Sequence, residues 1–290
     1  MNKISFSRII AGTMTWGVWG KNLDNAGMIK LIATCLDNQI TSFDHADIYG
    51  AYTTEEAFGK AFRTGGFQRD KAQFISKCGI KLLSEERCNT IKHYDYSHQH
   101  IIQSVEQSLK NLQTDYLDLI LLHRPSPLMM ADEIAEAVEK LKKEGKILDL
   151  GVSNFTPSQT ELLSQKIQIS VNQIQFSITH FDAMLDGSLD YMQTHQVIPM
   201  SWSPLGTVFK KDDETSLRIR KKVGELSMKY NVPEDVILIA WIVKHPAGII
   251  PVCGTSDTSR INHLMQSYSL DMELQDWFSL WTESAGKPVP

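Results

Sequence analysis

The chain has 290 residues, of which 42% are hydrophobic and 22% are charged, and its formal net charge is −5. These values are typical of an ordinary soluble globular protein that is long enough for one barrel-sized domain or two smaller ones. The negative charge argues against nucleic acid or an anionic membrane as the main partner, because both attract basic proteins.

No segment predicts secretion or a membrane anchor. The cysteines Cys35, Cys78, Cys88 and Cys253 are scattered along the chain and form no CxxC pair, which suits free thiols in a reducing cytosol. The amino-terminal segment lacks the apolar stretch and cleavage site of a signal peptide, and no run approaches the about 18 apolar residues of a membrane span. We therefore predict a cytoplasmic protein with no membrane partner.

Apolar runs alternate with amphipathic segments along the whole chain. The runs are RIIAGTM at 8–14, ITSF at 40–43, AQFISK at 72–77, LDLILLH at 117–123, ILDLGVS at 147–153, ISVNQIQFS at 169–177, VIPMSWS at 197–203 and GIIPVCG at 248–254. Several are apolar nearly throughout, as parallel strands covered on both faces are. They predict eight parallel strands.

The segments between the runs predict helices. Ile101, Val105, Leu109 and Leu112 share one helical face behind Ser97, a candidate amino-terminal cap. Similar segments follow at 134–141, before a candidate stop at Gly145, at 219–230, and at 233–243, which opens on a proline suited to a first helical turn.

Strand–helix alternation repeated eight times at this length predicts a (β/α)₈ barrel, with a single domain over residues 1–290. A doubly wound sheet is the rival architecture. Its usual nucleotide signature, GxGxxG after a strand, is absent from the sequence, and so is GxxxxGK followed by Ser or Thr.

Every run from the second onward ends in a polar or aromatic residue. In such a barrel the chemistry lies at the carboxyl ends of the strands. The residues there are Asp44, Lys77, His123, Ser153 with Asn154, Gln175, Trp202 and the stretch CGTS at 253–256. Each alone has an ordinary interpretation as a cap, a solvated charge, a structural histidine or a packed ring. Their joint placement on one predicted face favours an active site.

The stretch FDHADIYG, residues 43–50, places Tyr49 five residues after Asp44. A tyrosine has a pKa of about 10, and a nearby ammonium such as Lys77 lowers it by stabilising the phenolate. A buried ammonium in turn requires a carboxylate, which Asp44 offers. With His123 bonded to the same substrate oxygen, these residues predict an acid that protonates a carbonyl oxygen while another group delivers hydride.

These motifs resemble the aldo-keto reductase family over nearly the whole chain, and DHADIYG, SKCGI and HRPSPLM are most similar to its bacterial YdhF-type oxidoreductases. The matching segments, in the family's order and spacing, are FDHADIYG, SKCG, LLHRP, GVSNF, NQIQFS, SWSPLG and IIPVCGTSDTSR. The resemblance implies reduction of an aldehyde or ketone to an alcohol. Tyr49 would be the general acid, Lys77 would lower its pKa, Asp44 would pair with Lys77, and His123 would orient the carbonyl.

The resemblance also implies NADPH bound in extended form without a Rossmann domain, with NADH as the alternative. Ser153, Asn154 and Gln175 would hold the carboxamide, Trp202 would stack on the nicotinamide, and Arg260 would meet the 2′-phosphate. The pyrophosphate and adenosine path would be lined by Ser203, Leu205, Gly206, Gly254, Thr255 and Ser256. Many relatives carry a lysine at the position of Gly254, and Asp257 adds a negative charge nearby, so the preference for NADPH depends mainly on Arg260.

The substrate is expected to be a small carbonyl compound, held by Trp19, His93 and Tyr94. Trp19 follows the first run, and the other two lie in a long connection on the predicted active face, where loops commonly shape pockets. His98 and His100 flank a predicted helix start without an acidic cluster, so we predict no metal site. We expect a monomer or a weak homo-oligomer.

Two other functions share this fold. Potassium-channel β subunits have the barrel, bind NADPH and act chiefly on other proteins, so a regulatory binding protein with little turnover is the alternative. An isomerase or aldolase that uses Lys77 as a Schiff base is a third possibility. Pairing with Asp44 disfavours it, because a charged lysine is a poor nucleophile.

Overall fold

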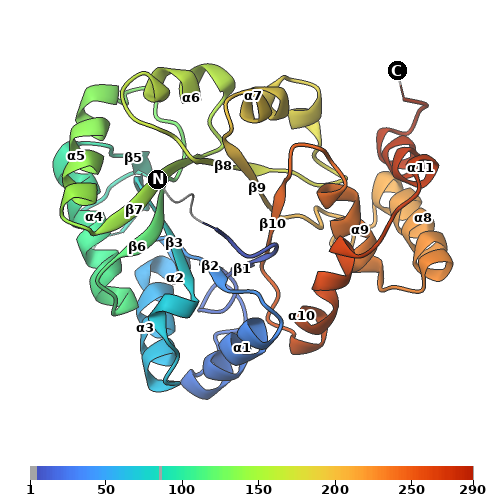
Figure 1. The fold of residues 1–290 in the computed structure, drawn as a ribbon, viewed down its shortest axis with the longest axis horizontal. Helices are drawn as coiled ribbons and strands as arrows, with labels where there is room; N and C mark the ends of the chain where they lie inside the picture. The colour runs from blue at the N-terminus through green and yellow to red at the C-terminus, as the bar shows by residue number, and fades with distance from the viewer. Residues whose placement is uncertain (1–4, 85–86, 290) are drawn as a thin grey trace.

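Eight parallel strands close into a ring in the computed structural model, which describes residues 5–84 and 87–289 (Figure 1). Their order around the barrel is β1-β10-β9-β8-β7-β6-β3-β2. The strands are β1 (Ile10–Gly12), β2 (Ser42–Asp44), β3 (Gln73–Cys78), β6 (Leu117–Leu122), β7 (Ile147–Ser153), β8 (Val171–Gln175), β9 (Ile198–Trp202) and β10 (Ile250–Cys253). Each predicted run contains one of them, or all but the last residue of one, so the (β/α)₈ barrel is confirmed. That this is a single domain stays a prediction.

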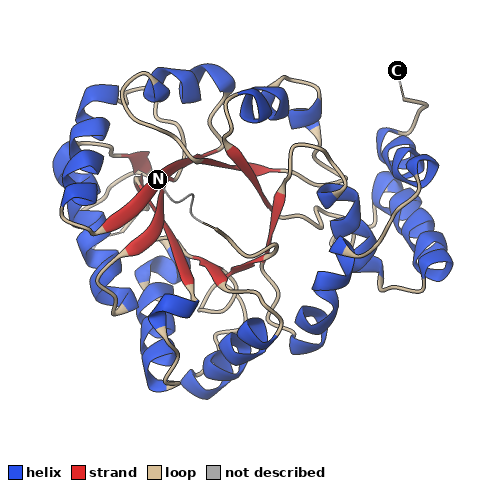
Figure 2. Ribbon diagram, in the orientation of Figure 1, coloured by secondary structure: helices blue, strands red, loops and turns tan. Residues whose placement is uncertain are grey.

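Helices cover the outside of the ring (Figure 2). They are α1 (Asn25–Asp37), α2 (Tyr49–Tyr52), α3 (Thr54–Thr64), α4 (His98–Leu112), α5 (Ala131–Lys143), α6 (Pro157–Ser164), α7 (Ser188–Thr194), α8 (Glu214–Tyr230), α9 (Glu234–Val243), α10 (Thr258–Leu264) and α11 (Leu274–Ala285). The predicted cap is confirmed, because the Ser97 hydroxyl accepts the N–H of His100 at 3.4 Å. Pro233 lies one position earlier than predicted, as the cap of α9 rather than in its first turn. No helix in the described part of the chain is long and apolar enough to cross a membrane.

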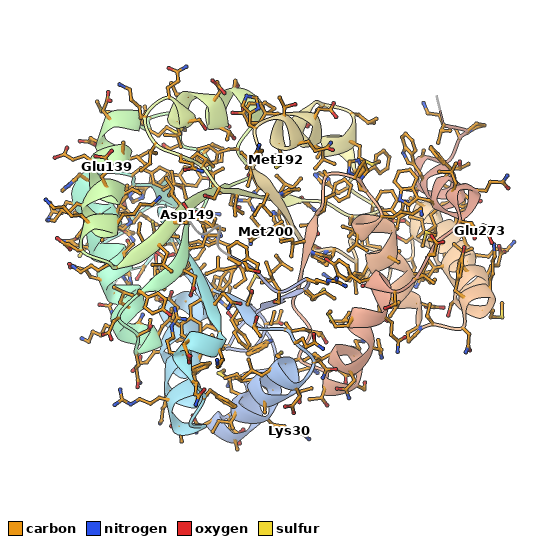
Figure 3. All side chains as sticks on the ribbon, viewed as in Figure 1. Lys30, Glu139, Asp149, Met192, Met200 and Glu273 are labelled. Atoms are coloured by element: carbon orange, nitrogen blue, oxygen red, sulfur yellow. The ribbon has the colours of Figure 1, made fainter. Side chains whose placement is uncertain are left out.

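The barrel interior has two layers of different character. One layer is apolar and is built from Ile10, Ile75, Leu119, Leu121, Val171, Met200 and Val252, with Phe6 packed against it. Met200 lies inside the ring, whereas charged side chains such as Lys30 and Glu139 point outward from the helices (Figure 3).

The upper layer is polar because the same strands change character one inward position later. Successive residues of a strand point to opposite faces, so inward positions are two apart. Lys77 follows Ile75, Gln173 follows Val171, and Trp202 follows Met200. The polar side chains that the sequence predicts at the strand ends therefore gather at one mouth, above an apolar floor.

Two additions flank the barrel. After β3 the chain forms a hairpin of β4 (Ile80–Lys81) and β5 (His93–Tyr94), paired antiparallel. At one edge α8 and α11 lie side by side outside the ring (Figure 1). The rings of Trp241 on α9 and Trp277 on α11 stack with their centroids 4.9 Å apart, which attaches this pair of helices to the barrel.

We expect Gly59→Ala to destabilise the fold, although alanine is the better helix former. An added Cβ at this position of α3 would lie 2.3 Å from the backbone oxygen of Asn111 on α4. Separating the two helices should cost about 1–3 kcal/mol, as overpacking does. Gly224 of α8 is the matched control, because its Cβ would meet only Glu234 Oε1, at 3.6 Å. Urea denaturation should show a loss for Gly59→Ala and none for Gly224→Ala; equal effects would contradict the close packing.

Candidate active site

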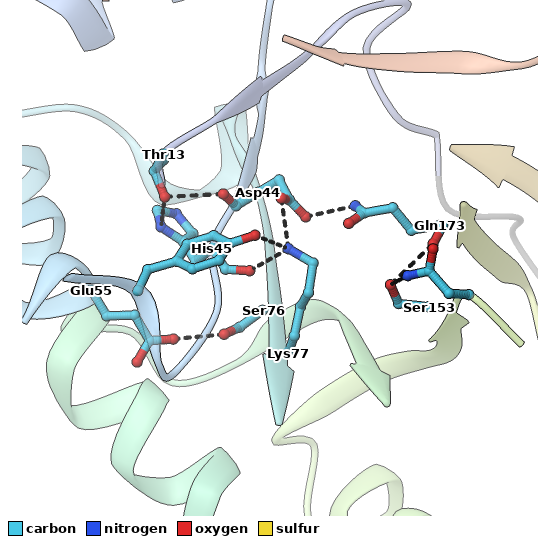
Figure 4. Close-up of polar contacts among 10 residues, drawn as sticks. Thr13, Asp44, His45, Glu55, Ser76, Lys77, Ser153 and Gln173 are labelled. Atoms are coloured by element: carbon cyan, nitrogen blue, oxygen red, sulfur yellow. Dashed lines mark hydrogen bonds and ion pairs between the residues drawn. The ribbon is translucent and has the colours of Figure 1, made fainter. Parts of the chain in front are cut away.

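Lys77 occupies the centre of the polar layer (Figure 4). Its side chain is buried, with a residue exposure of 1%. The Nζ atom donates to Asp44 Oδ2 at 2.6 Å, to the backbone oxygen of His45 at 2.8 Å and to the Tyr49 hydroxyl at 3.0 Å. These bonds use every N–H donor of an ammonium group. The structure therefore brings together in one cluster the lysine, the aspartate and the tyrosine that the sequence predicts as catalytic.

The second oxygen of Asp44 is also satisfied. Gln173 on β8 donates its Nε2 to Asp44 Oδ1 at 2.8 Å, across the barrel from β2 (Figure 4). Gln175 is among the residues predicted from the sequence, whereas Gln173 is not. The available signal was the period of two along the strand, since both glutamines share the inward face. Below Asp44, the Thr13 hydroxyl donates to the Asp44 backbone oxygen and contacts His45 Nδ1, each at 3.0 Å.

An unusual turn presents Tyr49 to Lys77. The residues after it, Gly50, Ala51 and Tyr52, have φ angles of 59°, 53° and 71°. The left-handed region costs an L-residue about 1–2 kcal/mol, so only Gly50 enters it freely. Such strain persists where surrounding contacts determine it, and here Thr53 Oγ1 donates to the Gly50 backbone oxygen at 2.7 Å.

Burial and charge act in opposite directions on Tyr49. Burial raises the pKa of Tyr49 and is the largest effect, while the Lys77 ammonium is the main influence that lowers it; the net direction is upward. Lys77 therefore lowers this pKa as predicted, but the expectation that the net shift is downward is wrong, because loss of hydration outweighs the effect of the ammonium. Burial also disfavours charge on Lys77, but Asp44 and Tyr49 overcome it and raise the Lys77 pKa.

His123 lies beside Tyr49, with ring centroids 6.1 Å apart and planes at 78°. Its exposure is 8%, and its Nδ1 has no hydrogen-bond partner in the part of the chain the structure describes. Burial, reinforced by Lys77, Arg124 and Lys92, holds the pKa of His123 well below its usual value. The imidazole is thus neutral at pH 7.

A second cluster joins the ends of β7, β8 and β9. Asn154 adopts a φ of 57° and donates Nδ2 to Ser153 Oγ at 2.8 Å. Its Oδ1 accepts from Trp202 Nε1 at 3.0 Å and from the Gln175 backbone N–H at 3.3 Å. The four residues expected to hold the nicotinamide end of the cofactor are therefore neighbours, and Gln173 connects their strands to Asp44.

A polar cavity of about 440 Å³ begins beside Gln175 and Ser203 and continues along Gly206, Lys210 and Lys211. Neither lysine forms an ion pair with a residue that the structure describes, although the Asp213 carboxylate lines the same cavity, where it caps α8 by accepting the Ser216 N–H at 2.8 Å. This arrangement fits an elongated anionic group such as a dinucleotide pyrophosphate. Neither lysine is among the residues predicted from the sequence. The sequence feature that could have identified them is the KK pair in the loop after the seventh run.

The remaining cofactor candidates have different surroundings. Gly254 is exposed, and its backbone oxygen accepts from Thr15 Oγ1 at 2.7 Å. Thr255 and Ser256 follow it, partly buried, and Leu205 packs against the outer core. Arg260 is exposed on α10 and forms no ion pair with a described residue, because Asp257 instead caps the helix by accepting the Ser259 N–H at 2.8 Å.

The three substrate candidates separate into two groups. Trp19 is 44% exposed, and its ring centroid lies 6.3 Å from that of Tyr49. His93 and Tyr94 form the exposed strand β5, and within the described residues no hydrogen bond or ring contact joins them to the four catalytic candidates.

His98 and His100 lie in the first turn of α4, and the described residues contain no group of three or more His, Cys, Asp or Glu that could hold a metal ion.

The carboxyl mouth of this parallel barrel holds a tyrosine, a lysine, an aspartate and a histidine. This combination is typical of one class of oxidoreductases, and comparison with known proteins agrees with that class. The model of the Aldo/keto reductase family matches residues 8–280, and the chain belongs to this family. It is 39% identical to the uncharacterized oxidoreductase YcsN of Bacillus subtilis, over 99% of this chain and 97% of the relative. It is 38% identical to the oxidoreductase YdhF of Escherichia coli, over 98% and 96%.

Other relatives are known by activity or by structure. A 6-dehydroglucose reductase of Agrobacterium fabrum is 36% identical, over 99% of this chain and 97% of the relative. The solved glycerol dehydrogenase of Gluconobacter oxydans superposes with a TM-score of 0.84 at 23% identity, covering 98% of this chain and 94% of that one. A Klebsiella pneumoniae aldo-keto reductase in complex with NADPH gives 0.80 at 23% identity, covering 98% and 92%.

The predicted family and its YdhF-type branch are thus confirmed, and so is an oxidoreductase, while NADPH as its cofactor stays a prediction. The site residues, the cytoplasmic location and the oligomeric state stay predictions.

We expect the Tyr49 hydroxyl of the cofactor-free protein to ionise above its ordinary pKa of 10.0, because burial raises that pKa. Lys77→Met should move the ionisation to still higher pH by removing the main influence that lowers it. Ultraviolet difference titration of each protein against its Tyr49→Phe counterpart isolates this one phenol. A Tyr49-dependent phenolate signal near neutral pH would contradict the dominance of burial.

Proposed function

We propose that the protein reduces an aldehyde or ketone to an alcohol, with Tyr49 as the proton donor. The observation that carries this proposal is the 3.0 Å hydrogen bond from Lys77 Nζ to the Tyr49 hydroxyl, with Asp44 holding the ammonium from the other side at 2.6 Å. Proximity to a fixed positive charge is what a phenol needs to release its proton into a reacting oxygen.

The proton has a defined route in this site. NADPH, when bound, supplies the hydride to the carbonyl carbon. The Tyr49 hydroxyl gives its proton to the substrate oxygen as negative charge develops there, and the Lys77 ammonium stabilises the phenolate left behind. Neutral His123 donates a hydrogen bond to the same oxygen and orients the carbonyl. Because burial favours the neutral phenol, Tyr49 already carries the proton that it donates when the substrate binds.

Residues along the mouth fit the cofactor. Ser153, Asn154 and Gln175 offer amide and hydroxyl groups to a carboxamide, and the Trp202 indole offers a flat face to the ring. The polar cavity with Lys210 and Lys211 suits the pyrophosphate, which continues toward the adenosine path at Gly254, Thr255 and Ser256. Arg260 is the cation available for a 2′-phosphate.

The alternative functions are less well supported. A Schiff-base enzyme needs a lysine with a free lone pair, whereas every donor of Lys77 is engaged and its pKa is raised. A purely regulatory protein has no need for a complete proton-donor cluster, and this cluster is intact. Steady-state NADPH oxidation with a panel of aldehydes separates an enzyme from a binding protein.

Tyr49→Phe should lower the rate of carbonyl reduction by about 10² or more, because general acid catalysis is worth about 10² to 10⁴. Folding and NADPH binding should survive, since only the hydroxyl is lost. Lys77→Met should be comparably damaging. Tyr52→Phe is the matched control, as it removes a hydroxyl three residues away that accepts from the Leu82 N–H. Stopped-flow NADPH oxidation with an aromatic aldehyde measures the chemical step. Retention of more than about a tenth of the wild-type rate by Tyr49→Phe would rule it out as proton donor.

NADPH should bind more tightly than NADH, with Arg260 responsible for the difference. The guanidinium is exposed and has no carboxylate partner among the described residues, so it is free to meet a phosphate. Arg260→Ala should weaken NADPH by about tenfold, the loss of one charge-assisted contact, and leave NADH nearly unchanged. Fluorescence titration with both nucleotides measures the two affinities. An equal loss for both would exclude contact with the 2′-phosphate.

A further inference from the structure

Arg124 follows His123 directly, and its backbone is held from both sides by one phenol. The Tyr96 hydroxyl donates to the Arg124 backbone oxygen at 2.5 Å and accepts the Arg124 N–H at 3.0 Å. Tyr96 is itself 5% exposed. It packs against Gly79, where an added Cβ would lie 2.1 Å from the Tyr96 ring. The position from which the arginine side chain leaves the backbone is therefore tightly constrained.

The guanidinium of Arg124 has no partner of its own. It is partly buried and lies 5.3 Å from the centroid of the Trp202 ring. It makes no side-chain hydrogen bond and no ion pair with any residue in 5–84 or 87–289. A guanidinium carries five N–H donors, and no Arg124 nitrogen is among the fully buried polar atoms without a partner, so an incoming ligand can reach them. An aromatic face supports the cation but satisfies none of these donors.

The charge of Arg124 reaches the reacting groups. It lowers the pKa of both Tyr49 and His123, and Lys92 acts on His123 in the same direction. The one carboxylate in the cluster, Asp44, is already bonded to Lys77 and Gln173. The mouth next to the expected carbonyl therefore has a surplus of positive charge.

The cofactor does not account for this surplus. In the proposed function its anionic groups are assigned to Lys210, Lys211 and Arg260, and the nicotinamide of NADPH is uncharged. Two cations near the catalytic cluster, Arg124 and Lys92, thus have no assigned anion, and of the two Arg124 is the partly buried one.

We propose that Arg124 binds a carboxylate on the substrate, so that the protein reduces aldehydo or keto acids in preference to their uncharged counterparts. The proposal rests on the proposed function, because it names the substrate class of that same site. The planar fork of a guanidinium matches a carboxylate with two parallel hydrogen bonds, which a lysine cannot do. The Trp202 ring lies 5.3 Å from the guanidinium carbon, and Tyr96 is bonded to the Arg124 backbone, so both restrict where the fork can lie.

Succinic semialdehyde and its methyl ester test the proposal, since esterification removes the charge of the carboxyl group and adds only one methyl group. The wild type should prefer the acid by about tenfold or more in kcat/KM, the size expected for a charge-assisted bond. Arg124→Met should lower the acid-to-ester ratio by a similar factor, mainly through a higher KM for the acid. Arg124→Lys, which keeps the charge but loses the fork, should recover only part of the ratio. Lys60→Met removes one exposed charge from α3 and is the control for net charge.

Binding without turnover separates the two proposals. Calorimetry with 4-hydroxybutanoate, the product of the acid, should show affinity that falls about tenfold in Arg124→Met. If the wild type binds this product through Arg124 yet reduces neither aldehyde, the proposed function fails and the carboxylate site stands. If both aldehydes are reduced and the acid-to-ester ratio is the same in wild type and Arg124→Met, the carboxylate site is overturned.

Two further outcomes would reassign the arginine. Glyceraldehyde 3-phosphate and glyceraldehyde form a second pair, and dependence of this pair alone on Arg124 would mean that the site recognises phosphate and not carboxylate. Weaker NADPH binding in Arg124→Met with an unchanged acid-to-ester ratio would make it a cofactor residue. Either result overturns the proposal.

Discussion

The buried ion pair of Lys77 and Asp44 is the interaction on which the mouth of the barrel depends. Taking an ammonium and a carboxylate out of water costs several kcal/mol each, which their attraction offsets only when their other hydrogen bonds are also made. Here they are made: His45 and Tyr49 take the remaining donors of Lys77, and Gln173 bonds the second oxygen of Asp44. Loss of either charge leaves the other uncompensated, a penalty of about 3–5 kcal/mol. The residues around the pair are therefore constrained by folding as well as by chemistry.

In the proposed mechanism, the same pair explains why the acid is Tyr49 and not Lys77 itself. Asp44 keeps Lys77 charged, so Lys77 acts through its field and not as a nucleophile or proton donor. Tyr49 is subject to burial, which favours its neutral form, and to Lys77, which favours the phenolate. In the proposed mechanism the neutral form prevails at rest, so Tyr49 keeps its proton until the substrate oxygen accepts it, and the Lys77 ammonium then stabilises the phenolate. A stronger electrostatic effect of Lys77 would deprotonate Tyr49 before the substrate bound.

Much of this arrangement is readable from the sequence, because parallel strands are apolar almost throughout and a polar residue at their end is conspicuous. Asp44, Lys77 and His123 stand out for that reason. Gln173 does not, since it lies inside a polar strand and its bond to Asp44 depends on how β8 faces β2 across the barrel. The bonds between Tyr96 and Arg124 join residues 28 positions apart and leave no local pattern. The direction of the Tyr49 pKa also requires a measure of burial, which spacing alone does not provide.

The net charge of −5 is a sum over the whole chain and does not describe the local charge of the site. Within the mouth, Asp44 neutralises Lys77, while Arg124 and the lysines of the polar cavity remain without carboxylate partners among the described residues. Beneath them lies the apolar layer closed by Phe6, whose low polarisability strengthens each charge interaction above it. A negatively charged protein with a positively charged mouth repels anions in general and attracts them at one place, since local fields in a cleft outweigh the distant net charge. Both ligands proposed here, a dinucleotide phosphate and a carbonyl acid, have the charge that such a mouth selects.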